Sequence, residues 1–223
     1  MSGHSKWAGI KHKKAIVDAK RGQAFTRASR EITIAAKEGG GDTEANFRLR
    51  LAVQKAREVN MPADKIQGAI DRGTGAGKGD SLEELRYEGY GPVGVAILVD
   101  AMTDNRNRTS ASLKHIFAKY GGNMAESNAV AWMFDRKGII ELDPAGKDPD
   151  DIGLAAIEAG AEDIQVENAE ITMHPKQTVP VEEEKVASVL RLLEHLEEDD
   201  DVQQVYANFD IPADVLERVS AQV

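Results

Sequence analysis

The feature that most restricts the fold is a change of hydrophobic period on either side of a glycine-rich run. This run, Gly73-Thr74-Gly75-Ala76-Gly77-Lys78-Gly79, cannot continue a helix cheaply and is typical of a linker. Before it, apolar residues recur at spacings of three and four, which is typical of helices. After it, short apolar runs that fit strands alternate with helical patterns. We therefore expect a helical N-terminal part joined by a linker to a part that contains sheets.

Three helices are expected before the linker. Phe25, Ala28, Ile32 and Ala35 form the apolar face of the first, which stops at the glycines of residues 39–41. Asp42 or Thr43 suits the N-cap of the second helix, and Pro62 the first turn of the third. The apolar residues of these two helices are Leu49, Ala52, Val53, Ala56, Val59, Ile66, Ala69 and Ile70. Residues 1–19 form an arm in front of the bundle.

The part after the linker is expected to mix strands and helices. Strands are predicted at residues 93–99, 130–134, 138–142, 170–173 and 202–209. Helices are predicted through Leu113 to Phe117 and at residues 150–159, 181–196 and 212–219. Such alternation is typical of α/β or α+β layers.

Charge is strongly segregated along the chain. Residues 1–78 carry a net charge of +8, residues 79–134 a net of -2 and residues 135–223 a net of -16, within a total of -10 over 223 residues. A basic head on an acidic body indicates a polyanionic partner for the head. The acidic run Glu197 to Asp201 is interpreted as a solvated helix end.

The first helix is predicted to place one stripe of cations opposite its apolar face. At about 100° per residue, Lys20, Arg27, Arg30 and Lys37 lie within roughly 100° of one another and are expected to face solvent. Such a stripe suits a phosphate backbone, because each neutralised phosphate releases counterions.

Further candidate nucleic-acid contacts lie in the arm and on the second helix. Arg48 aligns with Lys55 and Arg50 with Arg57, in two rows about half a turn apart, so both rows cannot meet one ligand face-on. Trp7 either stacks on an unpaired base or anchors the arm to the bundle. The complete set of candidates is Lys6, Trp7, Lys11, His12, Lys13, Lys14, Lys20, Arg21, Arg27, Arg30, Lys37, Arg48 and Arg50.

Several sequence motifs resemble the YebC family from one end of the chain to the other. They include Gly3-His4-Ser5-Lys6-Trp7-Ala8, Arg48-Leu49-Arg50-Leu51-Ala52, Asn60-Met61-Pro62, Tyr87-Glu88-Gly89-Tyr90-Gly91-Pro92, Thr103-Asp104-Asn105-Arg106-Asn107-Arg108-Thr109, Trp132-Met133-Phe134-Asp135-Arg136-Lys137-Gly138 and Val205-Tyr206-Ala207-Asn208-Phe209-Asp210. Two departures are seen. A strand and a helix that family members carry between Val166 and Ala169 are missing, and Ser127-Asn128-Ala129 stands where a Gly-Ser pair is usual.

The resemblance implies a multi-domain α+β fold, with a helical N-terminal bundle followed by two small α/β domains, the third inserted in the second. The expected domains are residues 1–77, residues 78–135 with 206–223, and an acidic insertion at residues 136–205. It also implies a DNA-binding transcriptional regulator. Some members of the family resemble ribosome-associated translation factors. The alternative is therefore a translation factor that binds ribosomal RNA and eases elongation through difficult stretches such as consecutive prolines. The N-terminus lacks an apolar signal core and the chain has no cysteine, so we expect a protein of the cytoplasm or of an organelle matrix.

Other chemistries fit the residues poorly. The absence of cysteine excludes disulfides, thiolate zinc sites and cysteine nucleophiles. The glycine run lacks Walker spacing, and the five His are scattered. A magnesium-dependent nuclease built on Asp150 with Glu183 and Glu184 is the remaining enzyme hypothesis. We expect no catalytic residues, cofactor, metal, membrane span or small-molecule substrate. The expected partners are DNA or ribosomal RNA and, in the translation alternative, the ribosome as a whole.

Overall fold

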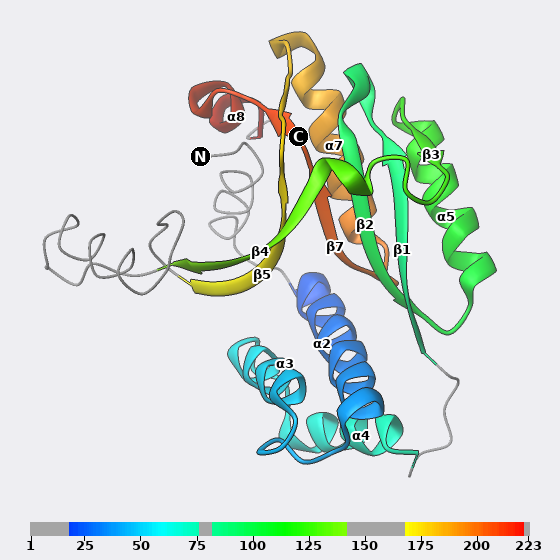
Figure 1. Cartoon of the computed structure of the whole chain (residues 1–223), viewed down its shortest axis with the longest axis vertical. Helices are drawn as coiled ribbons and strands as arrows, with labels where there is room; N and C mark the ends of the chain where they lie inside the picture. Colours follow the sequence, from blue (N-terminus) through cyan, green and yellow to red (C-terminus); the bar gives the residue numbers. More distant parts are fainter. Residues whose placement is uncertain (1–17, 76–81, 142–167, 221–223) are drawn as a thin grey trace, which may run out of the picture. The chain divides into compact units, whose positions relative to one another are not determined.

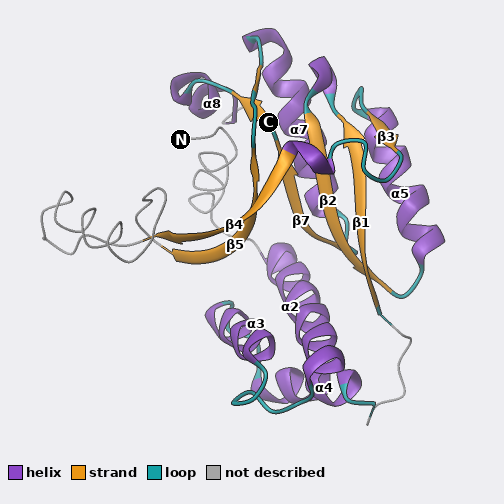
Figure 2. Cartoon of the chain, in the orientation of Figure 1, coloured by secondary structure: helices purple, strands orange, loops and turns teal. Residues whose placement is uncertain are grey.

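The computed structural model describes residues 18–75, 82–141 and 168–220 (Figure 1). The chain divides into two compact units, of which the first comprises Met1–Ala131 with Thr178–Val223 and the second Trp132–Gln177. Helices and antiparallel sheets are both present, which confirms the expected α+β class (Figure 2).

Three helices form the N-terminal part of the first unit, as expected. They are α2 (Asp18–Gly39), α3 (Phe47–Glu58) and α4 (Ala63–Gly73). Their core is made by the predicted apolar stripes and includes Ile32, Ala35, Leu49, Ala52 and Ala69, all fully or almost fully buried. Val59 was wrongly assigned to it, because this residue follows the end of α3 and is exposed. The helices therefore follow from hydrophobic period alone.

Asn46, rather than Asp42 or Thr43, caps the second of these helices. Its side-chain oxygen accepts a hydrogen bond from Leu49 N at 3.0 Å, and its amide nitrogen donates to the carbonyls of Ala35 and Gly40. The same side chain therefore joins the end of α2 to the start of α3. The expected cap residues were wrong because they lie in the turn between Gly40 and Asn46, where Asp42 instead accepts from Glu44 N.

A four-stranded antiparallel sheet forms the rest of the first unit. Its strand order is β3 (Asn123–Ala125), β1 (Glu83–Tyr90), β2 (Ala96–Thr103), β7 (Val202–Ala207). Val99 on β2 lies opposite Tyr87 on β1 and Val205 on β7. Helices α5 (Arg106–Lys119) and α7 (Glu183–Glu198) pack on this sheet around a second hydrophobic core (Figure 1).

Shorter elements complete this unit. A 3₁₀ turn, η1 (Pro92–Gly94), separates β1 from β2, and α8 (Ala213–Ser220) packs against α7. The two-residue strands β6 (Val179–Pro180) and β8 (Phe209–Asp210) pair in parallel.

A buried carboxylate fixes the loop after β3. Glu88 accepts backbone hydrogen bonds from Asn128, Val130 and Ala131 at 2.6 to 2.8 Å. Asn128 has φ +68°, a left-handed conformation that glycine adopts freely and asparagine tolerates. The Ser127-Asn128-Ala129 segment is therefore compatible with the backbone conformation of this loop.

The second unit contains an antiparallel pair of strands. After the 3₁₀ turn η2 (Ala131–Met133), β4 (Phe134–Glu141) pairs with β5 (Asn168–Pro175), with Phe134 opposite Pro175. Lys176 forms an ion pair with Asp135 at 3.2 Å. The helix expected at residues 150–159 lies outside the described residues.

The structure differs from the expected domain boundaries. The insertion predicted to run from 136 to 205 included α7 and β7, yet β7 pairs with β2 and α7 packs on the same core. The compact inserted segment is instead Trp132–Gln177. The strand expected from residue 93 starts at Ala96, because Val93 and Gly94 adopt positive φ in η1. The apolar run at 130–134 is mostly η2, and β1 was not predicted.

Candidate nucleic-acid interface

The predicted cation stripe on α2 does not lie open to solvent along its length. Arg30 forms an ion pair with Asp201 at 2.8 Å, and the side chains are 18% and 6% exposed. Arg30 also donates to the carbonyl of Asp200, and Gln23 donates to that of Glu198 at 2.6 Å. The middle of the stripe thus packs against the acidic turn that follows α7. The expectation that Arg27 and Arg30 face solvent was wrong, because that turn covers them.

Asp201 is the centre of this contact. Its carboxylate accepts hydrogen bonds from Thr109 at 2.6 Å, Thr103 at 3.2 Å and Arg108 at 2.9 Å, in addition to the ion pair with Arg30. Burial would raise the pKa of Asp201, but the hydrogen bonds of Thr109 and Arg108 and the charges of Arg30 and Arg108 outweigh it and lower the pKa. The interpretation of residues 197–201 as a solvated helix end was therefore wrong for Asp201, which is buried, although Glu198 and Asp200 are exposed.

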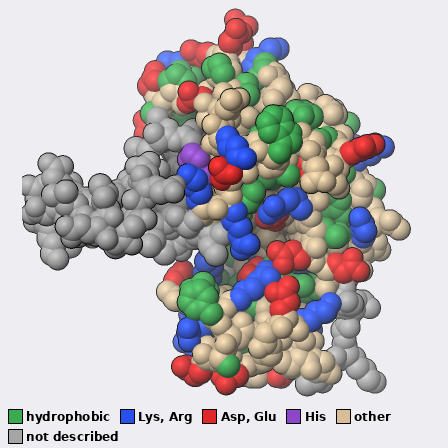
Figure 3. Space-filling model, viewed as in Figure 1, with side chains coloured by type: hydrophobic (Ala, Val, Ile, Leu, Met, Phe, Trp, Pro, Cys, Tyr) green, Lys and Arg blue, Asp and Glu red, His purple; other side chains and the backbone are tan. Residues whose placement is uncertain are grey.

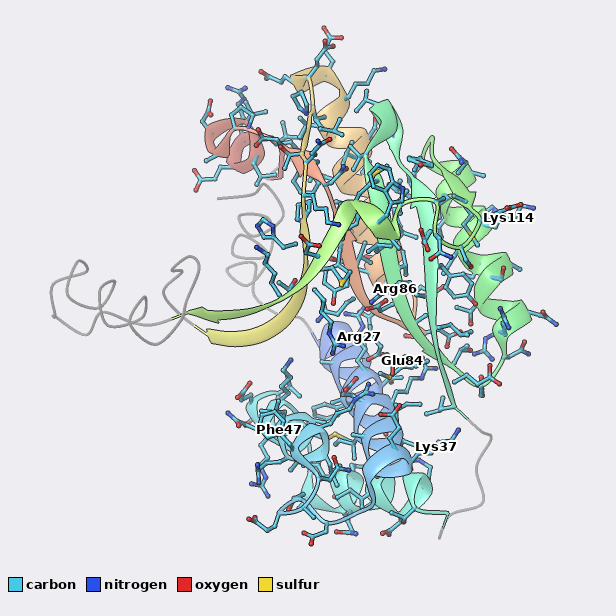
Figure 4. All side chains as sticks on the ribbon, in the orientation of Figure 1. Arg27, Lys37, Phe47, Glu84, Arg86 and Lys114 are labelled. Atoms are coloured by element: carbon cyan, nitrogen blue, oxygen red, sulfur yellow. The ribbon has the colours of Figure 1, made fainter. Side chains whose placement is uncertain are left out.

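Arg27 is partly buried beside the same turn (Figure 4). Burial lowers the pKa of its guanidinium, against the opposing charges of Asp200 and Asp199. Its Nε and Nη2 atoms are buried and have no hydrogen-bond partner among the described residues. Arg27 is therefore a cation held in the fold rather than displayed on its surface.

Arg48 is also engaged within the unit. Its guanidinium contacts three carboxylates, Glu31 at 3.2 Å, Glu38 at 2.7 Å and Glu84 on β1 at 3.0 Å. Burial alone would lower the pKa of Arg48, but Glu31 and Glu84 raise it above its usual value. Arg48 therefore connects α2, α3 and β1. Because three carboxylates neutralise its charge, it is poorly suited to bind a phosphate.

The exposed face of α3 carries a different arrangement. Phe47, labelled in Figure 4, is 61% exposed. The Arg50 guanidinium carbon lies 5.4 Å from the centroid of its ring. Arg50 also donates to the carbonyls of Thr43 and Glu44 at 3.4 and 3.3 Å. Arg57 lies two turns further along on the same row and is exposed, as is Lys55. An exposed aromatic ring beside cations offers both a stacking surface and phosphate contacts.

Sequence reasoning missed Phe47, although a signal was present. The buried face of α3 is formed by Leu49, Ala52, Val53 and Ala56, and a residue at position 47 is not part of that stripe. Because residues three apart on a helix are neighbours, an aromatic residue off the apolar stripe and three positions before an arginine is expected to lie beside that arginine on the outer face.

The other predicted contacts are only partly placed. Lys37 is exposed in the last turn of α2, and its Nζ donates to the carbonyl of Leu82 at 3.1 Å. Lys20 and Arg21 lie in α2, but their side chains are outside the description. The arm residues Lys6, Trp7, Lys11, His12, Lys13 and Lys14 also lie outside the described residues. On the face in view in Figure 3, Lys and Arg side chains neighbour Asp and Glu side chains.

The residues of the nuclease hypothesis are not brought together in the described part. Glu183 lies in the first turn of α7 and forms an ion pair with Arg218 at 2.6 Å, while Asp150 lies outside the described residues. Within the described ranges, no group of three or more His, Asp or Glu side chains is arranged to hold a metal ion. No described helix has the length and apolar character needed to cross a membrane.

Comparison with known protein families covers nearly all of the chain. A family model described as the TACO1/YebC protein N-terminal domain matches residues 5–76. A second, described as the TACO1/YebC second and third domain, matches residues 82–170 and 164–209. The chain belongs to the TACO1/YebC family. The resemblance inferred from the motifs is thereby confirmed.

Relatives in the TACO1/YebC family match over their full length. A protein of Natranaerobius thermophilus named "Probable transcriptional regulatory protein" is 52% identical, covering 97% of this chain and 99% of that protein. One of the same name from Dictyoglomus turgidum is 48% identical over 99% of this chain and 100% of the relative. A crystal structure of a conserved hypothetical protein, Aq1575 of Aquifex aeolicus, has a TM-score of 0.81 and 43% identity, covering 91% of this chain and 96% of that one.

The matches also locate where this family member is short. The alignment with the Natranaerobius protein runs over 248 positions, more than the 223 residues of this chain, so the relative has residues that this chain lacks. The second family model matches in two pieces that overlap at residues 164–170. Both observations agree with the shortening expected between Val166 and Ala169.

Proposed function

We propose that this chain is a non-enzymatic, nucleic-acid-binding regulator of gene expression that acts in the cytoplasm, and that DNA is its ligand in transcriptional regulation. The observation that carries the proposal is the row of exposed cations on α3, Arg50 and Arg57, on a head of net charge +8. The names of the family relatives, probable transcriptional regulatory proteins, support the regulatory role.

The contact residues follow from which cations the fold leaves accessible. Arg27, Arg30 and Arg48 are engaged with carboxylates or buried, so we assign them to structure. Arg50 and Arg57 lie exposed on one row of α3 and are candidates for phosphate contacts. The basic residues at positions 1–17, which lie outside the described residues, add charge to the same head. Each phosphate contact contributes affinity through counterion release, and this contribution weakens as salt rises.

A second candidate is a translation factor that binds ribosomal RNA. The observation in its favour is the exposed Phe47, because an exposed aromatic side chain stacks on unpaired bases, which folded RNA presents in loops and bulges. Base stacking is worth roughly 1–3 kcal/mol per base. A fully base-paired duplex offers no unpaired base on which Phe47 could stack. The effect of replacing Phe47 therefore distinguishes an RNA ligand from a duplex DNA ligand.

The test compares two aromatic substitutions in the full chain. Phe47→Ala is expected to weaken binding to a folded fragment of ribosomal RNA by about tenfold, the equivalent of one stacked base, if RNA is the ligand. If duplex DNA is the ligand, Phe47→Ala has a small effect and Arg50→Ala weakens binding to DNA. Trp132→Ala is the matched control, because Trp132 is 65% exposed but lies in the second unit.

The outcomes are read from binding isotherms of the same proteins with labelled duplex DNA and labelled ribosomal RNA. Sedimentation with ribosomes after DNase treatment, at moderate salt, provides the cellular counterpart. Binding to neither nucleic acid would contradict the proposed surface. So would a loss of DNA binding for Arg50→Ala, and of RNA binding for Phe47→Ala, no larger than the loss for Trp132→Ala. Magnesium-dependent cleavage by highly purified protein would contradict the non-enzymatic role.

A further inference from the structure

A second cationic site lies in the sheet part of the first unit, away from the helical head in the sequence. An open cleft of about 650 Å³ is formed where the end of α5, the η1 turn and the first turns of α7 meet. This volume is within the range of small-molecule sites. Three cations line it, Lys119 from α5 and Lys185 and Arg191 from α7.

The cleft is lined by positive charge, whereas the part of the chain to which it belongs is negatively charged. Residues 79–223 have a net charge of -18, yet no Asp or Glu is among the described residues that line the cleft. Lys185, Ser188 and Arg191 follow one another at spacings of three, so they share one face of α7. All three are exposed, and Lys119 is exposed in the last turn of α5. The cations are therefore accessible to an anion from solvent.

The other side of the cleft is apolar and aromatic. Val93 is 48% exposed and has φ +55°, which is rare for a β-branched residue. The turn holds it there through hydrogen bonds from Gly91 N to Val95 O at 2.7 Å and from Val95 N to Pro92 O at 3.3 Å. Strained residues of this kind concentrate at functional sites. The strain here leaves a large apolar side chain displayed beside the three cations.

Tyr120 provides a fixed ring between these two sides. Its ring stacks on His195 of α7 with centroids 4.4 Å apart and planes 20° apart. The Lys119 ammonium lies 5.3 Å from the centroid of the Tyr120 ring. Aromatic and apolar surface thus lies within reach of hydrogen-bond donors that suit phosphate.

We propose that this cleft binds a nucleotide, with its phosphate at Lys119, Lys185 and Arg191 and its base against Val93 and Tyr120. The nucleotide is either free or an unpaired unit of a nucleic-acid strand, since the chemistry recognised is the same. The site goes beyond the proposed function and does not depend on it, because none of its residues belongs to the head.

The experiment uses the full chain carrying Phe47→Ala and Arg50→Ala, so that the proposed head surface is removed. Binding of AMP, ATP, inorganic phosphate and a short single-stranded RNA is measured by calorimetry. The affinity for each probe is compared between this protein and the same protein that also carries Lys119→Gln and Arg191→Gln. Lys114→Gln is the matched control, since Lys114 is an exposed lysine of the same helix that does not line the cleft (Figure 4). Unchanged thermal unfolding shows that the variants are folded.

Loss of two charge-assisted contacts is expected to weaken binding by at least about tenfold, while Lys114→Gln leaves it within about twofold. Binding of AMP or ATP identifies a free nucleotide as the source, and binding of the strand alone identifies an unpaired unit of nucleic acid. Inorganic phosphate binding as tightly as AMP would overturn the base contact. Absence of binding by every probe, or equal binding by the Gln double variant, would overturn the site. Failure of the head surface leaves these outcomes unchanged, so the two proposals are separately testable.

Discussion

Asp201 shows how a single residue changes the interpretation of the surrounding charges. Its carboxylate joins Arg30 of α2 to Thr103, Arg108 and Thr109 of the sheet part. These residues are separated from Arg30 and from Asp201 by long stretches of chain, so no sequence pattern links them. Helical period correctly placed Arg30 opposite the apolar face, but it carries no information on what covers that face.

Asp201→Asn is expected to lower the free energy of unfolding near neutral pH by about 2 kcal/mol, because charged hydrogen bonds are replaced by neutral ones. The pKa of Asp201 is lowered in the folded state. Its contribution is therefore fully present above the unfolded value of about 4 and is lost as pH falls through the lower folded value. The difference between wild type and variant should shrink below about pH 4. Urea unfolding across pH measures it.

Asp210→Asn is the control for this prediction, because Asp210 is exposed on β8. It is expected to change stability by less than about 0.5 kcal/mol. A loss for Asp201→Asn no larger than that of the control, or one that does not vary with pH, would show that the charge of the Asp201 carboxylate adds nothing to folding.

At the scale of elements, the helices were predictable and the sheet only in part. The apolar stripes of α2, α3 and α4 predicted which residues of these helices are buried, because each helix packs through one face. Strand β1 was missed because its residues 83–86 are exposed or half-buried and mostly charged, so only its end is apolar enough to recognise. The domain boundary was wrong because a pairing such as β2 with β7 joins residues about a hundred positions apart.

A substitution at Gly73 tests the close packing of α4 against α2. A Cβ atom at this position would lie 2.4 Å from the Thr33 carbonyl oxygen and 2.7 Å from the Ala36 Cβ. Gly73→Ala is therefore expected to destabilise the chain by about 1–3 kcal/mol, although alanine is the better helix former. Gly22→Ala is the control, because a Cβ at Gly22 meets no atom within 4 Å. Thermal unfolding in which both variants are equally stable would contradict the packing of these helices.

At the scale of the whole molecule, the charge segregation has two consequences. The acidic turn at residues 199–201 neutralises part of the basic head from within the same unit, through Arg30 and beside Arg27. The cations that remain exposed on α3, with Phe47, form the surface proposed for nucleic acid. Sequence alone correctly indicated the basic head and the family, but it could not separate cations used in folding from those left for a ligand.

The salt dependence of nucleic-acid binding by the full chain tests this division most directly. Arg50→Ala with Arg57→Ala should lower the magnitude of the slope of log K against log salt for duplex DNA by about two, one for each lost phosphate contact. Arg27→Ala with Arg30→Ala, measured where the variant is still folded, should lower stability and leave the slope unchanged. A slope that falls only for the Arg27 and Arg30 pair would contradict the account, because it would place the phosphate contacts on α2.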